Sequence, residues 1–347
     1  MSLASGHKVV PLEGEELAKQ KKDFIGHKSG LVRLNPERWL FTTAFLKYGD
    51  KYYNFKFEPN DVLLMTWPKC GTTWMQEIVW TMRNNPDLGH ALASLSTMAR
   101  SPFIEMDFFL DDLVDFENVA ESPLLKNFDI ACPGRNPRDG IMLQMAELAS
   151  PPRTLKTHLP LSLFAPSLLE TTKVVYVARN PKDVVVSFHH HSRMIKVHGY
   201  VGSFPDFVQY FVDDNLAYGP YWLHLKEAWE KRHHPNLHFV FYEDLKEDIM
   251  GELRKLNDFL GTELTDNQLN NVAKHSSFSE MKARDAMGLD KDETLCDQKV
   301  ISKEGGFFRK GETGSWKAKL TPELEDKVDK WITRHLNDFG INFKYCL

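Results

Sequence analysis

A lysine-bearing turn between an apolar run and a pair of threonines is the segment of this sequence best suited to bind an anion. Val62 to Met65 read as a buried strand, Pro68 ends it, and residues 69–73, Lys-Cys-Gly-Thr-Thr, lead into a helical pattern. The free amides and positive dipole end of a helix start attract phosphate or sulfate, and a lysine adds a full charge. The sequence therefore predicts a site for a phosphate-like group around Lys69.

The order of residues in this turn differs from the signature of nucleotide triphosphatases. That signature has Gly-Lys-Ser/Thr at its end, whereas Lys69 here precedes Gly71, the only glycine of the turn. An ordinary triphosphatase or nucleotide kinase is therefore disfavoured. Taken alone, the segment also fits a plain strand-to-helix turn with a surface lysine.

Composition and charge limit the functions that the chain can have. The 347 residues are 42% apolar and 26% charged, as in an ordinary globular protein, and the formal net charge is -5. A generally basic nucleic-acid binder is excluded, so an anion site must be a local cluster of Lys and Arg. The sequence has no pattern of a signal peptide or membrane span, and its four cysteines are too scattered for a disulfide framework or a zinc site. We expect a cytoplasmic protein that binds neither nucleic acid nor membrane.

Apolar, β-rich runs alternate with helical patterns, which favours a single α/β domain over residues 1–347 with a central, mostly parallel sheet. The clearest predicted strands are Val62 to Thr66, Lys173 to Ala178 and His238 to Tyr242. Each is followed by a helix start, and the carboxyl ends of parallel strands usually build the ligand crevice of such a sheet. The last predicted helix runs from about Pro322 to Asn337.

Three further segments carry reactive or charged side chains in chain order. Lys156 and His158 stand two positions apart, Arg179 ends a predicted strand, and residues 305–311 read Gly-Gly-Phe-Phe-Arg-Lys-Gly. Taken with the lysine turn, these segments closely resemble the cytosolic sulfotransferases, and the resemblance runs from about Leu40 to Trp331. Four motifs in the expected order are far more specific than any of them alone.

This resemblance implies transfer of the sulfonate group of 3'-phosphoadenosine 5'-phosphosulfate to the hydroxyl of a small apolar phenol or alcohol, without a metal. Lys69 would stabilise the negative charge that develops on the bridging oxygen, and Lys156 would support it. His158 would be the general base, because a neutral imidazole has a suitable pKa near working pH. The released product would be 3'-phosphoadenosine 5'-phosphate.

The same resemblance implies the residues that bind the cofactor. Arginine can grip a phosphate through two parallel hydrogen bonds, and aromatic rings stack on an adenine. The residues implied at the 5'-phosphosulfate are Lys69, Cys70, Gly71, Thr72 and Thr73. Those implied at the 3'-phosphate and in the basic loop are Arg179, Ser187, Phe307, Phe308, Arg309, Lys310 and Gly311, and those implied around the adenine are Trp74, Tyr242, Ser276 and Phe278.

The acidic, aromatic and turn-rich stretch 107–150 is predicted to be an inserted lid over the acceptor pocket. A similarly placed extension occurs in retinol dehydratase, an insect family member that uses sulfonation to drive loss of water from an alcohol. The alternatives are a packed surface helix and loop for this stretch, and a sulfonation-driven dehydratase of an allylic alcohol, such as a retinoid, for the protein. A non-catalytic small-ligand binding protein is less favoured, because both the lysine and the base are present. The predicted acceptor contacts are Phe103, Met106, Phe108, Phe109 and His158.

Three features depart from the family pattern or leave alternatives open. Cys70 stands where serine is common, and a thiol at a helix start is expected to have a lowered pKa and to be open to oxidation. Pro322 and Asp326 alter the C-terminal dimer motif, which leaves the family homodimer open. The run 189–191, His-His-His, reads as a packed cluster rather than a metal site, and the alternative that one member faces the acceptor pocket stays open.

Overall fold

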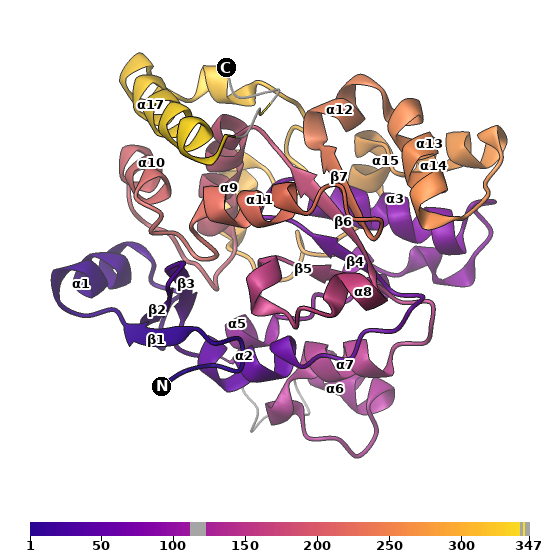
Figure 1. The fold of residues 1–347 in the computed structure, drawn as a ribbon, viewed down its shortest axis with the longest axis horizontal. Coiled ribbons are helices and arrows are strands. Elements are labelled where there is room, and N and C mark those ends of the chain that lie inside the picture. The colour runs from indigo at the N-terminus through magenta and orange to yellow at the C-terminus, as the bar shows by residue number, and fades with distance from the viewer. Residues whose placement is uncertain (112–122, 341–342, 344–347) are drawn as a thin grey trace.

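A four-stranded parallel sheet lies at the centre of the protein (Figure 1). The computed structural model describes residues 1–111, 123–340 and 343. The strand order is β5-β4-β6-β7, and the strands are β4 (Val62–Met65), β5 (Thr154–Thr157), β6 (Lys173–Ala178) and β7 (Leu237–Phe241). The three predicted strands are confirmed to within one residue. Their apolar runs reflect burial on both faces, which parallel strands in α/β folds share.

Helices cover both faces of this sheet because successive strand residues point to opposite sides. Leu63 and Val174 belong to one apolar cluster, and their neighbours Leu64 and Val175 to another. The first face is covered by α9 (Pro181–Met194), α11 (Tyr221–Glu230) and α17 (Pro322–Phe339), and the second by α3 (Thr72–Asn84), α12 (Tyr242–Glu247), α13 (Ile249–Leu260) and α14 (Asp266–His275) (Figure 1).

An N-terminal antiparallel sheet adjoins this core, and the sequence did not predict it. It consists of β1 (Lys8–Pro11), β2 (Leu31–Asn35) and β3 (Trp39–Thr42), together with α1 (Gly14–Asp23) and α2 (Phe45–Tyr53). Leu40 of β3 accepts a hydrogen bond from the Tyr218 amide (3.0 Å) and donates one to the Gly219 carbonyl (3.0 Å). The small sheet thereby fixes the segment that carries Tyr218.

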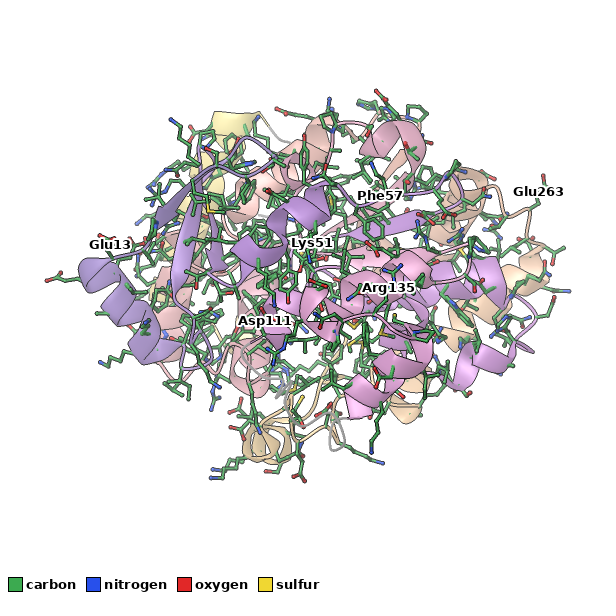
Figure 2. The ribbon with its side chains drawn as sticks, turned by 90° about the horizontal axis from the view of Figure 1, so that it is seen from below. Glu13, Lys51, Phe57, Asp111, Arg135 and Glu263 are labelled. Atoms are coloured by element: carbon green, nitrogen blue, oxygen red, sulfur yellow. The ribbon has the colours of Figure 1, made fainter. Side chains whose placement is uncertain are left out.

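The described parts of the predicted lid are helical and packed, while residues 112–122 lie outside the described residues. The elements in the described parts of this stretch are α5 (Asp107–Leu110), α6 (Pro123–Ala131), the 3-10 turn Pro137–Asp139 and α7 (Ile141–Leu148). The Asp107 carboxylate accepts hydrogen bonds from the amides of Met142 and Leu143, both at 2.9 Å, which caps the start of α7. Figure 2 shows the underside where Lys51 and Asp111 lie, and the Tyr48 hydroxyl donates to Asp111 at 2.6 Å.

The remaining elements are short, apart from the last helix. They are α4 (Thr97–Arg100), α8 (Leu168–Thr171), α10 (Phe204–Val212), α15 (Phe278–Ala283), α16 (Gln298–Glu304) and 3-10 turns at Ala91–Ser94, Leu161–Leu163 and Ser315–Ala318. α17 begins at Pro322 as predicted and ends two residues later than predicted, where Gly340 takes a left-handed conformation. Among the described residues, no helix has the length and apolarity needed to cross a membrane.

Candidate active site

The lysine turn joins the carboxyl end of β4 to the start of α3. Gly71 is the N-cap of α3 with φ +105°, and a Cβ there would lie 2.6 Å from a ring carbon of Tyr242, so only glycine fits. The Thr72 and Thr66 hydroxyl oxygens are 2.6 Å apart, which ties the helix start to the strand end. The strand, turn and helix predicted from the sequence are all present. The first amides of α3 can therefore donate to an anion at this turn.

Four cationic side chains from separate parts of the chain line one cavity with this turn. Lys69 comes from the turn, Lys156 from β5, Arg179 from the end of β6, and Arg309 from the loop after α16. Burial, together with the positive charges of the other three, lowers the pKa of Lys69 to about 7. Buried like charges are unfavourable unless an anion compensates them. This cluster therefore fits a ligand with several negative charges.

Arg179 is held at the centre of this cluster by backbone carbonyls. Its two terminal nitrogens donate to the carbonyl oxygens of Lys69 (3.1 Å) and Glu312 (3.0 Å), and its guanidinium lies 4.2 Å from the ring centroid of Tyr242. Its Nε is buried and has no hydrogen-bond partner among the described residues. An unpaired buried donor beside a basic cluster indicates a place for a ligand oxygen.

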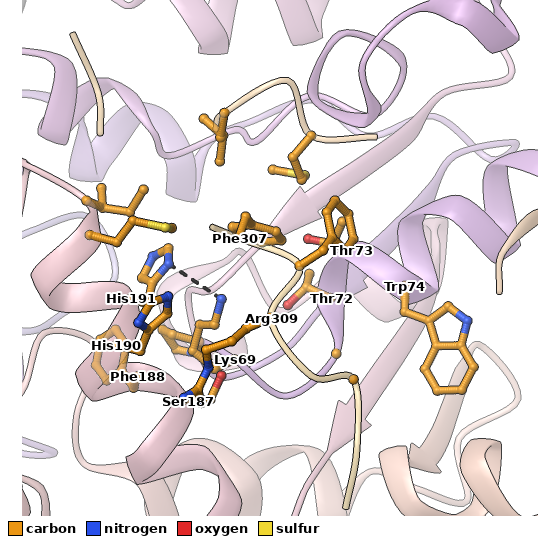
Figure 3. A pocket seen from close by; sticks show the side chains of 18 of the residues that line it. Lys69, Thr72, Thr73, Trp74, Ser187, Phe188, His190, His191, Phe307 and Arg309 are labelled. Carbon is orange, nitrogen blue, oxygen red and sulfur yellow. Dashed lines mark hydrogen bonds between the residues drawn. The ribbon is translucent and has the colours of Figure 1, made fainter. Parts of the chain in front are cut away.

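The basic loop that carries Arg309 is anchored at both ends by carboxylates that accept hydrogen bonds from its backbone. Asp183 of α9 accepts hydrogen bonds from the Gly314 amide (2.7 Å) and the Ser315 hydroxyl (3.1 Å), and Asp290 accepts one from the Phe307 amide (2.7 Å). Positively charged side chains of this loop are thus brought to the turn after β4. Figure 3 shows Arg309 beside Lys69.

His158 lies at the carboxyl end of β5, at the boundary between the cationic cluster and an apolar compartment. Its Nδ1 is 2.8 Å from the Thr66 carbonyl oxygen, so this nitrogen carries the proton and Nε2 keeps a lone pair. Burial and the charge of Lys156 hold the pKa of the imidazole well below its usual value. The ring packs 5.1 Å from Phe103 and 5.5 Å from Tyr218, centroid to centroid. The pKa of His158 in the free protein is therefore lower than the sequence suggested, but the neutral imidazole keeps a lone pair on Nε2 that can accept a proton.

Glu105 is a member of the site that the sequence reasoning did not assign. Its carboxylate accepts the His158 amide at 2.5 Å, and burial raises the pKa of this carboxyl. Burial lowers the pKa of Lys156, and Glu105 opposes that shift. The Lys156 Nζ lies 3.8 Å from the ring centroid of Phe103. The only signal in the sequence was a single acidic residue that ends the apolar segment Ser-Pro-Phe-Ile-Glu.

The three consecutive histidines of α9 point in different directions. His189 packs against aromatic rings, 5.0 Å from Phe204, while His190 and His191 line the cavity. The His191 Nδ1 lies 3.5 Å from the Lys69 Nζ (Figure 3). Within the described part of the chain, no group of three or more His, Cys, Asp or Glu side chains is arranged to hold a metal ion. Two members of the run therefore line the cavity, and His191 lies beside Lys69; contact of either histidine with the acceptor stays a prediction.

Residues 59–340 match the family of the sulfotransferase domain. The chain belongs to the sulfotransferase family. Sulfotransferase 1E1 of Homo sapiens is 35% identical over 301 residues, which cover 86% of this chain and 92% of that protein. Luciferin sulfotransferase of Photinus pyralis is 31% identical over 310 residues, which cover 88% and 80%. The α/β fold and the family expected from the sequence are confirmed.

This sulfotransferase also resembles solved structures over nearly its whole length. Retinol dehydratase in a complex with retinol and PAP, which is 3'-phosphoadenosine 5'-phosphate, matches with a TM-score of 0.81 and 30% identity. The match covers 97% of this chain and 98% of that one. A second structure of retinol dehydratase, with androsterone and PAP, has a TM-score of 0.80 at the same identity.

The sulfotransferase cavity collects most of the residues implied for the cofactor. Trp74 and Tyr242 meet edge to face at 5.5 Å, and the Ser276 hydroxyl donates to the Val272 carbonyl of its own helix at 2.8 Å. A Cβ at Gly311 would lie 2.2 Å from the Phe278 ring, so this glycine allows close packing. The implied cofactor residues that line the cavity are Lys69, Gly71, Thr72, Thr73, Trp74, Arg179, Ser187, Tyr242, Ser276, Phe278, Phe307, Phe308, Arg309, Lys310 and Gly311.

Cys70 is the exception in the turn, and the expectation of a reactive thiol is wrong. Its side chain is 1% exposed and packs in the main apolar cluster, away from the cavity lining. Burial raises the pKa of the thiol, because it disfavours the thiolate more than nearby Arg179 favours it. The backbone of Cys70 remains part of the turn, but its sulfur is not presented to a ligand.

The other compartment of the cavity is apolar. It contains three of the four apolar residues that were predicted to contact the acceptor. Phe103, Met106 and Phe109 line it, whereas Phe108 does not. The Phe108 ring is fully buried against Phe45, with centroids 5.6 Å apart, because consecutive residues of a helix point about 100° apart. The other apolar residues that line the cavity as a whole are Met98, Phe188, Met194, Ile195, Val197, Tyr218, Met281, Met287, Leu289 and Leu295.

Proposed function

We propose that this sulfotransferase transfers the sulfonate group of 3'-phosphoadenosine 5'-phosphosulfate to the hydroxyl of a small apolar phenol or alcohol. The observation that carries the proposal is the position of neutral His158 between a cluster of four cations, of which Lys156 and Arg179 are buried, and an apolar compartment. The cofactor, when bound, supplies an activated sulfonate and a good leaving group. The chain then has to bind negative charge, orient a hydroxyl and accept its proton.

The cationic compartment fits the two anionic ends of the cofactor. We propose that Lys69 and the first amides of α3 hold the 5'-phosphosulfate, and that Arg179 and Arg309 hold the 3'-phosphate with Ser187 beside them. The unpaired Nε of Arg179 and the lowered pKa of Lys69 support this assignment. A bound oxyanion would accept a hydrogen bond from this Nε, and its negative charge would stabilise the protonated form of Lys69. The structures of retinol dehydratase with PAP give the same cofactor chemistry in a relative.

His158 is the proposed general base. The Thr66 carbonyl fixes its Nδ1–H, so Nε2 is the nitrogen that takes the proton of the acceptor hydroxyl. Burial, together with the positive charge of Lys156, lowers the pKa of the imidazole and keeps it neutral before the reaction. Lys69 is proposed to lie against the bridging oxygen, where negative charge increases as the bond to sulfur breaks.

The apolar compartment determines the class of acceptor. Its methionines and aromatic rings suit an acceptor with an apolar body. The hydroxyl of that acceptor is then the group that must reach His158. We propose that the segment 107–150 covers this compartment as a lid, since Phe109 near its start lines the cavity. The free thiols of Cys70, Cys132 and Cys296 are compatible with a reducing cytoplasm as the working compartment.

A sulfonation-driven dehydratase is the second candidate function. The observation in its favour is the similarity to retinol dehydratase over 97% of this chain. An allylic sulfate ester can lose sulfate as its carbon-oxygen bond breaks, and loss of a proton from the remaining allylic cation then gives an alkene with a further double bond. Both functions use the same transfer residues, so only the product distinguishes them.

The test is a screen of phenols, catechols, steroids and retinoid-like alcohols with labelled cofactor, with the mass of each product recorded. A phenol or alcohol that gains the mass of a sulfonate supports the first function, and an alcohol that loses the mass of water supports the second. Binding of 3'-phosphoadenosine 5'-phosphate without any acceptor-dependent release from the cofactor would contradict both. A variant with Lys69→Met should lose transfer in either case.

A further inference from the structure

A second groove shares a wall with the active-site cavity. The wall is residues 193–200, at and beyond the end of α9. Ile195 and Val197 line the active-site cavity, whereas Arg193 and Lys196 line the groove. A ligand in the groove would therefore contact the same backbone segment that shapes the apolar compartment.

This wall is tied closely to the chain on its far side. The Gly26 amide donates to the His198 carbonyl (3.1 Å), and the Ile25 amide donates to the Gly199 carbonyl (3.2 Å). A Cβ at Gly26 would lie 2.3 Å from the Lys196 carbonyl oxygen, so the two backbones are in direct contact. These contacts hold the backbone of residues 25–26 directly against the wall.

The groove is basic although the whole chain carries a net charge of -5. Its one acidic lining residue, Asp297, uses its carboxylate to accept the Lys299 amide (2.8 Å) at the start of α16. Local positive charge in an acidic protein favours an anionic ligand at this place. The cationic lining residues are Lys28, Arg193, Lys196 and Lys319.

The positive charges of the groove affect a neighbouring histidine, and they differ in their partners. Burial and the charges of Arg193 and Lys319 lower the pKa of His189 to about 3. The Lys319 Nζ lies 5.3 Å from the ring centroid of Phe204, and Arg193 is paired with Glu304. Among the described residues, Lys196 and Lys319 form no ion pair with a carboxylate, and the Lys196 Nζ donates to the Glu293 carbonyl oxygen (2.5 Å).

The groove also exposes large apolar side chains beside its cations. Ile25 is 61% exposed and Val201 is 60% exposed, and both line it. Exposed aliphatic groups next to basic groups suit a ligand that has an apolar body and an acidic head. Inorganic phosphate or sulfate alone would leave this apolar surface in water.

We propose that the groove is a binding site for a small organic anion with an apolar body, such as a sulfate ester or a carboxylate. Its acidic group lies against Lys196 and Lys319, and its apolar body covers Ile25 and Val201. Because of the shared wall, occupancy of the groove changes the fit of the acceptor. This consequence rests on the proposed function, whose sulfated products are themselves apolar organic anions.

The binding test uses 2-naphthalenesulfonate as the probe in the presence of saturating 3'-phosphoadenosine 5'-phosphate. Calorimetry of the wild-type protein should show two sites, one in the acceptor compartment and one in the groove. The double variant Lys196→Gln, Lys319→Gln should lose one site or weaken it at least tenfold, whereas Lys231→Gln, at an exposed lysine outside the groove, should bind as the wild type does. Equal binding by wild type and double variant, or equal binding of inorganic sulfate, would overturn the proposal.

The kinetic arm uses 2-naphthol as acceptor. Inhibition of the wild type by 2-naphthalenesulfonate should persist at saturating 2-naphthol, and in the double variant it should become purely competitive. Identical inhibition patterns in the two proteins would overturn the coupling. If no acceptor is turned over, the proposed function fails, but the loss of the second site in the double variant is still measured by calorimetry.

Discussion

The Lys69 Nζ lies 3.5 Å from the His191 Nδ1, and both side chains line the same cavity (Figure 3). Burial and the charges of Lys69 and His198 hold the pKa of His191 well below its usual value, so its imidazole is neutral. A neutral imidazole with a free Nδ1 can accept a hydrogen bond from the lysine ammonium. We infer that His191 positions Lys69 beside the turn after β4.

Replacing His191 should therefore affect turnover more than cofactor binding. His191→Phe removes the acceptor and keeps an aromatic ring, and we expect kcat to fall about tenfold, the low end for a hydrogen bond to a charged group. His191→Asn offers a side-chain oxygen near the position of Nδ1 and should restore most of the activity. Steady-state kinetics and the Kd of 3'-phosphoadenosine 5'-phosphate check this. Equal loss in both variants would contradict a positioning role.

Cofactor binding should depend on pH through Lys69. Its pKa is lowered to about 7 in the free protein, and a bound oxyanion favours the charged form and raises this pKa. Above pH 7 a proton must therefore be taken up on binding, and affinity should fall as pH rises. Calorimetry at pH 8 in two buffers of different ionisation enthalpy gives the number of protons taken up per nucleotide bound. Lys69 should contribute close to one proton in the wild type, and the Lys69→Met variant should lack this contribution. Unchanged uptake in the variant would contradict the assignment.

Arg309 should discriminate between nucleotides with and without a 3'-phosphate. Arg309→Gln should weaken 3'-phosphoadenosine 5'-phosphate about 10- to 100-fold, as expected for charge-assisted hydrogen bonds, and adenosine 5'-phosphate little. Arg179 is a less clean choice, because it also holds the carbonyls of Lys69 and Glu312. Arg334→Gln, on the exposed face of α17, is the matched control. Equal weakening of both nucleotides would remove Arg309 from the 3'-phosphate site.

Cys70 should resist oxidation in the folded protein. Its thiol is buried and its pKa is raised, so little thiolate is available to react. Treatment with a thiol reagent followed by peptide mass analysis should leave Cys70 unmodified until the protein is denatured, and Cys70→Ser should have the same peroxide sensitivity as the wild type. Rapid modification of Cys70 in the native protein would show that the turn opens.

Local signals made part of the fold and site predictable. Lys69 and Gly71 stand in a turn whose flanking strand and helix are continuous in sequence, and residues 174–178 of the strand β6 form an uninterrupted apolar run. β5 was harder to recognise, because it carries Lys156 between threonines rather than an apolar run. Its burial depends on neighbours that are distant in the chain.

Long-range packing explains what the sequence did not reveal. The contact of Glu105 with the His158 amide joins residues 53 positions apart, and that of Lys69 with His191 joins residues 122 apart. Phe108 was assigned to the pocket with its neighbours, but its direction depends on how α5 packs on α2. The environment of Cys70 likewise follows from the core beneath the turn.

His158 carries the central claim, and its replacement tests it most directly. The measurement is release of 3'-phosphoadenosine 5'-phosphate from the cofactor, with and without an active phenol, by the wild type and by His158→Ala. We predict acceptor-dependent release by the wild type, a loss of at least about 100-fold in the variant for want of a general base, and an unchanged Kd for the released nucleotide in both. Acceptor-dependent release by His158→Ala within tenfold of the wild type would contradict the account.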